Sequence, residues 1–383
     1  MPEGDAPSAA PPLDLPEDVF VVYRALTDGD RRLYFGVRLG SQGAVEQQVT
    51  RTFGAADYEV RCTSADSVDV EAADDVVARD VVVVEPSEVG VDGVPWTNVG
   101  LFLATVLSTL YAGSLWYHID LSNPLSAVRA WPFTLAIVSV LGVHEMGHYL
   151  FSRYHGVNAT LPYFIPVPTL IGTMGAVIRM KGRIPDREAL FDIGVAGPIA
   201  GLVATVVVTT VGLYLDPVTI PEAVRTDPDA VRVEIGFPPL MYVLSWLTGQ
   251  PLTYPEGQAV NPVVIGGWVG MFVTFLNLIP VGQLDGGHVL RAILGSRYER
   301  YAALVPGALF ALAAYVEFVR DAPGNAALVW VVWGVIATFL SFAGSVRPVD
   351  DAEPLDRRRV AVGLLTLVLG LLCFTPVPIA VIQ

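Results

Sequence analysis

Seven apolar stretches of about 20 residues constrain the fold of this chain more than any other feature of its sequence. They lie near residues 98–117, 131–153, 188–215, 260–281, 299–319, 325–346 and 360–380. A helix of about 20 apolar residues spans the hydrocarbon core of a bilayer, and spanning helices satisfy all their backbone hydrogen bonds internally. We therefore expect an α-helical, multi-pass membrane protein with about six or seven transmembrane helices.

The composition agrees with membrane insertion but divides the chain unevenly. Of the 383 residues, 53% are hydrophobic and 16% are charged, which is typical of a membrane protein. Residues 1–97 contain 19 acidic and 7 basic residues, a net charge of −12, whereas residues 98–383 contain 19 and 16, a net charge of −3. We expect the first quarter to be acidic and exposed to water, and its charge argues against nucleic acid as a partner.

This acidic quarter is expected to hold a lead and a small domain. Residues 1–16 are rich in Pro, Ala and acidic residues and are expected to be disordered. Residues 17–95 contain strand-like and helix-like segments without a cluster of ligand residues, which predicts a soluble α+β accessory domain rather than a catalytic one. Residues 98–383 form the expected membrane domain, with a catalytic core at about 130–295.

Two further segments break the pattern of spanning helices. Residues 161–180 are apolar but contain several Pro and Gly residues, which suits a re-entrant, β-like segment, either a hairpin or a sheet. Such a backbone is tolerated at membrane depth only where protein covers it or where it lines a cavity. Residues 237–249 are too short to span a bilayer and are expected to lie at an interface.

The basic residues predict an orientation in the cell membrane. The N-terminus shows no basic stretch followed by an apolar one, so we expect no signal peptide and a cytoplasmic N-terminus. Twelve Arg and Lys residues then lie in or beside the inner loops 153–187, 282–298 and 347–359, against four in the outer loops. The second apolar run would end on the cytoplasmic side.

Lysine and cysteine usage adds two smaller expectations. Lys181 is the only lysine beside 22 arginines, which together with the acidic excess predicts adaptation to high salt in a halophilic archaeon. A GC-rich genome that favours Arg codons is the alternative. Cys62 and Cys373 are far apart and predict neither a disulfide framework nor a cysteine zinc site.

The second apolar run contains the sequence HEMGH at residues 144–148. Because four residues are close to one helical turn, His144 and His148 share one helix face and can hold one zinc ion. Glu145 could then act as a general base on a zinc-bound water. Ionisable groups are costly in hydrocarbon, so this placement favours a function over a solvated polar face or buried, hydrogen-bonded histidines.

The fourth apolar run ends in a second polar motif, NLIPVGQLDGGH at residues 277–288. The predicted orientation places it at the same membrane depth as HEMGH. Asp285 is a plausible third zinc ligand, because two His and one carboxylate leave a fourth position open for water. His288 is a competing ligand, and a polar residue near the surface is its alternative role.

Together the two motifs resemble the site-2 protease family of intramembrane zinc metalloproteases. The family pattern is HExxH followed by NxxPxxxxDG, and this chain meets every fixed position. Residues 172–187 and 191–201 resemble the membrane-inserted β-structure and the small-residue helix of the subgroup in archaea, cyanobacteria and chloroplasts that lacks a PDZ domain. The resemblance covers residues 130–295 most strongly.

The resemblance implies an enzyme with one Zn²⁺ per chain, whose ligands would be His144, His148 and Asp285. Glu145 would be catalytic, and Asn277 would stabilise the oxyanion or orient the substrate, with a helix-packing amide as its alternative. Residues 172–179 could pair with an unwound substrate as an added strand, or could be a purely structural loop.

The remaining singled-out positions are expected to be structural. Asp192 is interpreted as an interfacial or helix-capping carboxylate. Three glycines of the third run, Gly194, Gly197 and Gly201, are expected to allow close helix packing. Gly147 would serve packing or access to the metal.

The predicted function is therefore an intramembrane zinc endopeptidase that cuts in or near transmembrane segments of membrane proteins, in contact with lipid. A catalytically inactive membrane scaffold or chaperone of the same fold is the alternative. A metal transporter is a third hypothesis, but its polar residues should line several helices, whereas here they gather at one depth.

Overall fold

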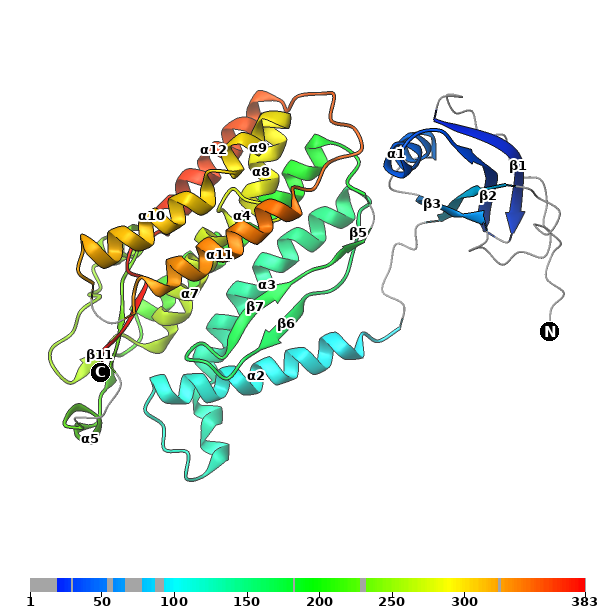
Figure 1. Ribbon diagram of the computed structural model, residues 1–383. Coiled ribbons are helices and arrows are strands. Elements are labelled where there is room, and N and C mark those ends of the chain that lie inside the picture. Colours follow the sequence, from blue (N-terminus) through cyan, green and yellow to red (C-terminus); the bar gives the residue numbers. More distant parts are fainter. Residues whose placement is uncertain are drawn as a thin grey trace.

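The computed structural model describes residues 19–28, 30–53, 58–65, 78–86, 93–181, 183–227, 232–322 and 325–382. Within these ranges the chain is mostly helical, with a small sheet at its N-terminal end (Figure 1). The expected disordered lead, residues 1–16, lies outside the described residues.

The N-terminal part is a four-stranded antiparallel sheet with one helix on it. Its strands are β1 (Phe20–Asp28), β2 (Arg31–Arg38), β3 (Tyr58–Ser64) and β4 (Asp80–Pro86), in the order β1-β2-β4-β3. Helix α1 (Gln42–Phe53) buries Val45 and Val49 against one face of the sheet. Because side chains alternate along a strand, Val82 of β4 faces this core while Val83 faces the other side. The strands and helix expected from the sequence are present here.

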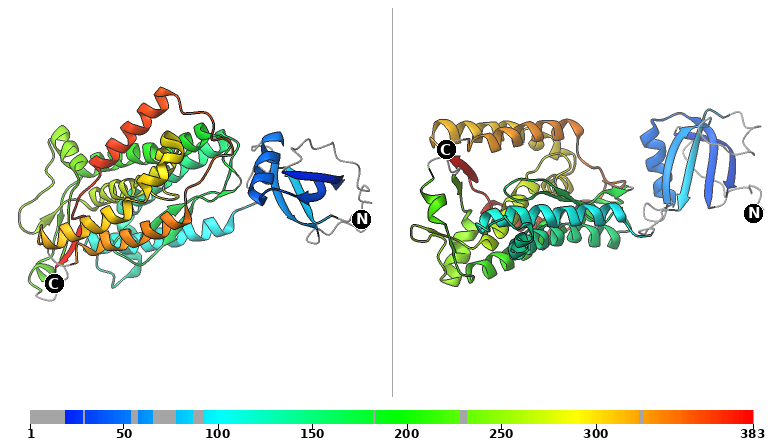
Figure 2. Two further views of the ribbon diagram at one scale, coloured as in Figure 1. Left: turned by 45° about the horizontal axis from the view of Figure 1, so that its top comes forward. Right: turned by 90° about the horizontal axis from the view of Figure 1, so that it is seen from below.

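An ion pair joins helix α1 of this N-terminal part to the helical body. Arg183, in the loop before α4 (Arg187–Leu213), pairs with Glu46 of α1. The other carboxylate oxygen of Glu46 accepts a hydrogen bond from the backbone N–H of Cys62 at 3.0 Å. Figures 1 and 2 show the sheet beyond the end of the body at which the short strand β5 (Asn158–Ala159) lies.

Each of the seven expected apolar runs overlaps one helix of at least 14 residues. These helices are α2 (Trp96–Trp116), α3 (Trp131–Tyr154), α4, α7 (Pro262–Asn277), α10 (Val305–Phe318), α11 (Leu328–Ala343) and α12 (Arg357–Leu372). Between them lie α5 (Glu222–Arg225), α6 (Pro239–Thr248), α8 (Asp285–Leu294) and α9 (Tyr298–Ala302), and 3-10 turns at Pro124–Ala130 and Gly295–Arg297. Two short strand pairs, β9 (Val218–Thr219) with β11 (Gln258–Ala259) and β10 (Arg232–Ile235) with β12 (Ile379–Ile382), complete the body.

By length and composition, three helical segments of the described chain can cross a membrane: Trp96–Trp116, Pro124–Tyr154 and Arg187–Leu213. The pair Asp285–Ala302 and Val305–Phe318, bent by 58°, adds a fourth if it counts as one span. The helices α7, α11 and α12 have 16 residues each, which is short for a span. The membrane character expected from the sequence is therefore supported, and the count of six or seven spans stays a prediction.

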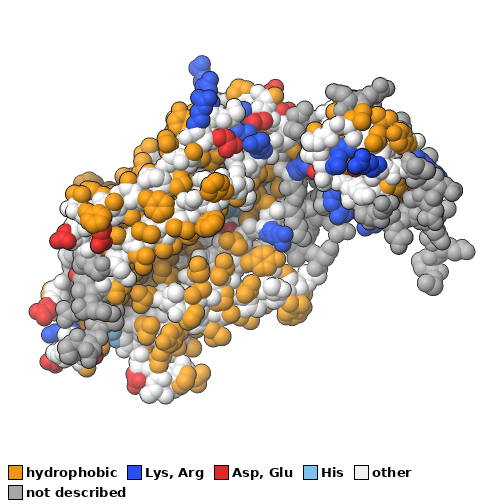
Figure 3. Space-filling model, viewed as in Figure 1, with side chains coloured by type: hydrophobic (Ala, Val, Ile, Leu, Met, Phe, Trp, Pro, Cys, Tyr) orange, Lys and Arg blue, Asp and Glu red, His pale blue; other side chains and the backbone are white. Residues whose placement is uncertain are grey.

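The surface of the helical body is apolar in its middle part. Charged side chains gather toward its two ends, with a mainly hydrophobic band between them (Figure 3). Phe318, Phe342 and Trp246 are 83%, 87% and 80% exposed, which would be costly in water. Such a band suits contact with lipid chains.

The Pro- and Gly-rich segment expected at 161–180 is a β-hairpin between α2 and α3 (Figures 1 and 2). Strand β6 (Tyr163–Pro166) pairs antiparallel with β7 (Thr173–Val177), and β5 pairs with β8 (Met180–Lys181). Gly172 at the turn has φ +82°, and a Cβ there would lie 2.6 Å from Thr109 of α2. The hairpin packs tightly on α2, which fits the rule that irregular backbone in a membrane is covered by protein.

Small residues let α3, α4 and α7 approach closely. A Cβ at Gly266 of α7 would lie 2.5 Å from the Cβ of Ala136 on α3, and one at Gly270 would lie 2.2 Å from Oγ1 of Thr205 on α4. Small side chains of this kind allow backbones to pack without lipid between them. This three-helix core carries HEMGH on α3 and Asn277 at the end of α7.

Candidate metal centre

Helix α3 carries the HEMGH motif into the interior of the body. His144, Glu145 and His148 are all buried, at 2%, 8% and 7% exposure. His144 and His148 lie ten and six residues before the last residue of the helix, or roughly 15 and 9 Å along its axis. The motif is therefore held well inside the apolar part of the molecule.

The second motif lies where a helical segment is broken. Helix α7 ends at Asn277 and α8 begins at Asp285, with Pro280 between them. Gly282 has φ +57°, and a Cβ at Gly286 would lie 2.1 Å from the carbonyl oxygen of Leu278. These glycines allow the chain to turn and α8 to start against the end of α7. Asp285 thus lies at a helix N-terminus, where the helix dipole stabilises a carboxylate.

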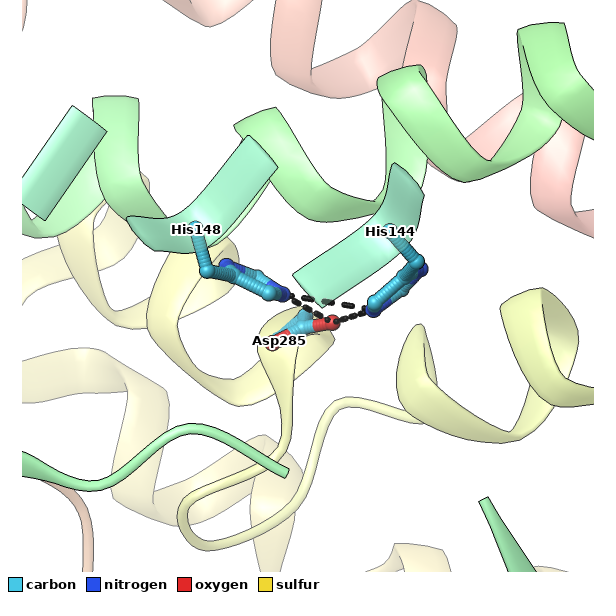
Figure 4. Close-up of side chains that lie close together, drawn as sticks. All are labelled: His144, His148 and Asp285. Atoms are coloured by element: carbon cyan, nitrogen blue, oxygen red, sulfur yellow. Dashed lines mark hydrogen bonds and ion pairs between the residues drawn. The ribbon is translucent and has the colours of Figure 1, made fainter. Parts of the chain in front are cut away.

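The two motifs meet with three donor atoms close together (Figure 4). Oδ2 of Asp285 lies 3.2 Å from Nε2 of His144 and 3.1 Å from Nε2 of His148, and the two nitrogens are 3.3 Å apart. Two ligands bound to tetrahedral zinc at about 2.05 Å lie about 3.3 Å from each other. The three separations therefore fit one tetrahedral zinc ion, as does the donor set.

The charge of the site also fits a cation. Glu145 and Asp285 are two largely buried carboxylates within one small region. Among the described residues, neither carboxylate forms an ion pair with Lys or Arg. Two buried carboxylates with no Lys or Arg partner are unfavourable, so a divalent cation between them would offset the cost.

The imidazole of His148 is fixed by the backbone of α4. Its Nδ1 lies 2.8 Å from the carbonyl oxygen of Ile193, which can only accept, so Nδ1 donates this hydrogen bond. In the neutral imidazole the lone pair is then on Nε2, which faces the centre. A Cβ at Gly197 would lie 2.0 Å from Nε2 of His148, and one at Gly201 would lie 2.7 Å from Nδ1 of His144. These two glycines make room for the two rings.

Glu145 lies beside the three donors but is not one of them. Its Oε2 accepts a hydrogen bond of 2.9 Å from the backbone N–H of Ile178, the residue after β7. The hairpin thus orients the carboxylate.

Asn277 belongs to the centre and His288 does not. Nδ2 of Asn277 lies 3.0 Å from Nε2 of His144. His288 is buried on α8, but the cluster of possible ligands found among the described residues contains Asp285 instead. Within those residues, Nε2 of His288 has no hydrogen-bond partner. The geometry therefore favours Asp285 over His288 as the third donor.

Several contacts of the centre are not anticipated by the sequence. The Ile178 amide that holds Glu145 is a backbone group and leaves no signal in residue type. The sequence predicts Gly197 and Gly201 only as packing positions. Their spacing of four residues equals that of the two histidines, and this match could have indicated that they face the rings.

Residues 132–316 match the family model described as Peptidase family M50. Two curated relatives from Arabidopsis thaliana are similar over more than three fifths of this chain. The probable zinc metalloprotease EGY1, chloroplastic, is 32% identical over 252 residues, which cover 63% of this chain and 43% of that protein. The probable zinc metalloprotease EGY2, chloroplastic, is 31% identical over 250 residues, or 65% of this chain and 42% of that protein.

The chain thus spans about two fifths of the length of these relatives. A solved structure, the site-2 protease from Methanocaldococcus jannaschii, is 20% identical, covers 66% of this chain and 93% of its own, and superimposes with a TM-score of 0.29. A TM-score this low does not establish a common fold. The family match contains both motifs, HEMGH and NLIPVGQLDG, so the resemblance seen in the sequence is confirmed. Residues 132–316 are a Peptidase family M50 domain, of the site-2 protease family.

Proposed function

We propose that this chain is an intramembrane zinc endopeptidase that hydrolyses peptide bonds in or near transmembrane segments of other proteins. The observation that carries the proposal is the trio of donors on α3 and α8, 3.1 to 3.3 Å apart and enclosed in the apolar body. A carboxylate that is not a ligand stands next to them, as hydrolysis requires. The M50 match and the names of the relatives support this activity.

In this proposal His144, His148 and Asp285 hold one zinc ion per chain and leave a fourth position for water or substrate. When bound, zinc supplies Lewis-acid chemistry that polarises the scissile carbonyl and makes water a stronger acid. The His148–Ile193 hydrogen bond keeps the lone pair of Nε2 directed at the centre.

Glu145 would move the proton. Its Oε2 is held by the Ile178 N–H, so we assign proton transfer to Oε1. Oε1 would accept a proton from the attacking water and later give it to the leaving amine. The fixed orientation limits the rearrangement needed during the reaction.

Asn277 would act on the substrate carbonyl. Its amide lies beside His144, at the end of α7. A side-chain N–H donor at this position can stabilise the negative charge that develops on the carbonyl oxygen.

Strand β7 is the proposed docking edge for the substrate. It pairs with β6 on one side, and the residue that follows it contacts Glu145. A peptide bond within a helix is shielded by its own hydrogen bonds, so the substrate must unwind before attack. An unwound segment added to β7 would gain backbone hydrogen bonds close to the catalytic carboxylate.

The membrane orientation is part of the proposal. The excess of Arg and Lys near the inner loops favours a cytoplasmic N-terminal domain and a centre nearer the cytoplasmic side. We propose that water reaches the site from that side. The two relatives are chloroplast proteins, whereas the sequence of this chain predicts the cell membrane.

The test compares Glu145→Gln with Glu317→Gln, an exposed glutamate on α10, in purified protein with a transmembrane substrate. Loss of the general base should lower cleavage by at least about 100-fold while one zinc per chain remains bound. Glu317→Gln should cleave like the wild type. Cleavage by the Glu145→Gln variant at the wild-type rate would refute the mechanism.

The same samples separate the alternatives. A wild-type protein that binds zinc but cuts no membrane substrate would support the inactive scaffold or chaperone. Zinc flux through proteoliposomes without proteolysis would support the transporter.

A further inference from the structure

Asp192 of α4 joins three helices one residue away from the contact that fixes His148. Its Oδ1 accepts a hydrogen bond from Nε of Arg359 at 2.9 Å. Its Oδ2 lies 3.1 Å from Nη2 of Arg359 and 3.0 Å from Nε2 of His155. His155 caps the C-terminal end of α3, and Arg359 belongs to the first turn of α12. The side chain of Asp192 is 15% exposed, so water screens these contacts only partly.

The guanidinium of Arg359 is fully engaged. Besides the two bonds to Asp192, its Nη1 lies 3.0 Å from Glu188 of α4 and 2.8 Å from Asp356. Asp356 in turn caps α12 by accepting the backbone N–H groups of residues 358 and 359. A planar guanidinium bound in this forked manner has a defined orientation, which a lysine ammonium does not reproduce.

Helix α12 packs against α4 and α8, the two helices that hold His148 and carry Asp285. A Cβ at Gly363, one turn after Arg359, would lie 2.8 Å from Phe191 of α4 and 3.2 Å from Val289 of α8. The helix therefore touches both the element that fixes His148 and the element that carries Asp285. It lies beyond residues 132–316, the extent of the family match.

We propose that Asp192 and Arg359 are positioning residues for the zinc site. The carbonyl of Ile193 can accept the hydrogen bond from Nδ1 of His148 only if α4 keeps its position along α3. Asp192 fixes this position at the adjacent residue, through His155 on α3 and Arg359 on α12. The inference rests on the proposed function, because it assumes that His148 is a zinc ligand.

The expected effect is on metal affinity and geometry. Groups that orient a ligand commonly contribute about 10- to 100-fold to metal affinity. Asp192 acts through Ile193 rather than on the ring itself, so we expect the lower part of that range. Asp192→Asn and Arg359→Gln should each weaken zinc binding about tenfold.

The experiment measures zinc affinity by competition with a chelator in detergent-solubilised full-length protein. The variants are Asp192→Asn, Arg359→Gln and Arg359→Lys, and Arg358→Gln is the matched control. Arg358 is an exposed residue of the same helical turn with the same charge. The visible spectrum of Co²⁺ bound in place of zinc reports the ligand geometry, which a general loss of stability would not change. Thermal unfolding of the metal-free proteins reports stability separately.

The proposal expects weaker zinc binding and an altered Co²⁺ spectrum in Asp192→Asn and Arg359→Gln. Arg359→Lys should recover part of the affinity, and Arg358→Gln should match the wild type. Wild-type affinity and spectrum in both Asp192→Asn and Arg359→Gln would overturn the proposal and leave the proposed function intact. If either variant fails to fold, zinc affinity is compared between Arg359→Lys and Arg358→Gln. Weaker binding by Arg359→Lys supports the proposal, and equal binding overturns it. A wild-type protein that binds no zinc would overturn both.

Discussion

The two halves of the metal centre are built in opposite ways. Helix α3 delivers His144 and His148 from an unbroken helix, where a spacing of four residues alone puts them on one face. The other half comes from a break, where α7 stops at Asn277 and α8 restarts at Asp285. One half therefore depends on helical regularity and the other on the interruption of a helix.

This difference separates what each half needs from the rest of the molecule. The rings of α3 need an adjacent surface without side chains, which Gly197 and Gly201 provide. Asp285 needs the backbone to turn and α8 to abut α7, which Gly282 and Gly286 permit. Glycines thus serve both halves, for space alone in the first and for space and backbone conformation in the second.

Removal of a donor atom from either half should weaken zinc binding to a similar extent, and this is the largest effect that we expect. His148→Ala and Asp285→Ala should each weaken zinc binding by more than about 100-fold, beyond the range found for residues that only orient a ligand. Zinc content after gel filtration and chelator competition would measure the loss.

His288→Ala tests the assignment of the second half. Because His288 lies outside the donor cluster, this variant should still bind one zinc per chain, with a loss confined to stability. Zinc loss in His288→Ala with retention in Asp285→Ala would show that the wrong residue of α8 had been assigned.

The same contrast explains how far the sequence could predict the structure. HEMGH could be interpreted from helical periodicity alone, because both ligands lie in one regular element. Asp285 could be placed from the depth at which an apolar run ends and from the family resemblance. From the residues alone, His288, three residues later, remained a competitor, and the backbone places it outside the donor cluster. The hairpin at 161–180 could be predicted from its Pro and Gly content.

Contacts between backbone and side chains lay beyond sequence reasoning. The N–H of Ile178 that holds Glu145 and the carbonyl of Ile193 that holds His148 could belong to any residue type. The sequence predicts Asp192 only as a capping or interfacial carboxylate, because nothing in it links this residue to Arg359, 167 positions later. Long-range partners of this kind are decided by tertiary packing.

Asn277 lies at the last residue of α7 and should influence catalysis more than metal binding. Asn277→Ala should lower kcat by about 10²- to 10³-fold if its amide stabilises the oxyanion. Zinc affinity should change little. Steady-state cleavage together with zinc titration would distinguish the two effects.

Asn261→Ala is the matched control at the other end of α7. The side chain of Asn261 caps that helix by accepting the Val263 N–H, so its loss should cost about 1 kcal/mol of stability without a specific change in kcat. If Asn277→Ala instead lowered zinc affinity and left kcat unchanged, Asn277 would be a support of His144 rather than a catalytic group.

The glycines of the two halves should be equally intolerant of a methyl group. A Cβ at Gly197 would lie 2.0 Å from Nε2 of His148, and one at Gly286 would lie 2.1 Å from the Leu278 carbonyl oxygen. We expect Gly197→Ala and Gly286→Ala to weaken zinc binding by about 10- to 100-fold. Gly307→Ala on α10, where a Cβ meets open space, should be neutral or slightly stabilising. Equal behaviour of all three variants in chelator competition would show that close approach does not govern the site.

Among the changes within the break, Pro280→Ala should have the smallest effect on zinc affinity, although proline is the most visible helix breaker in the motif. In a continuous helix residue 280 would donate to the carbonyl of Leu276, which Pro280 cannot do, and here the N–H of Ile279 approaches that carbonyl at 3.2 Å. Alanine would restore the missing donor and favour the helix by up to about 3 kcal/mol.

Gly282 and Gly286 oppose that gain. Gly282 keeps a positive φ in a turn that the Pro280→Ala substitution would not alter, and each glycine disfavours a continuous helix by about 1 kcal/mol. The close contact of Gly286 with Leu278 also remains available. We therefore expect zinc affinity to fall by less than about tenfold, or 1.4 kcal/mol. A loss as large as that of Asp285→Ala would mean that Pro280 alone maintains the break, and the second half of the site would then depend on a single ring.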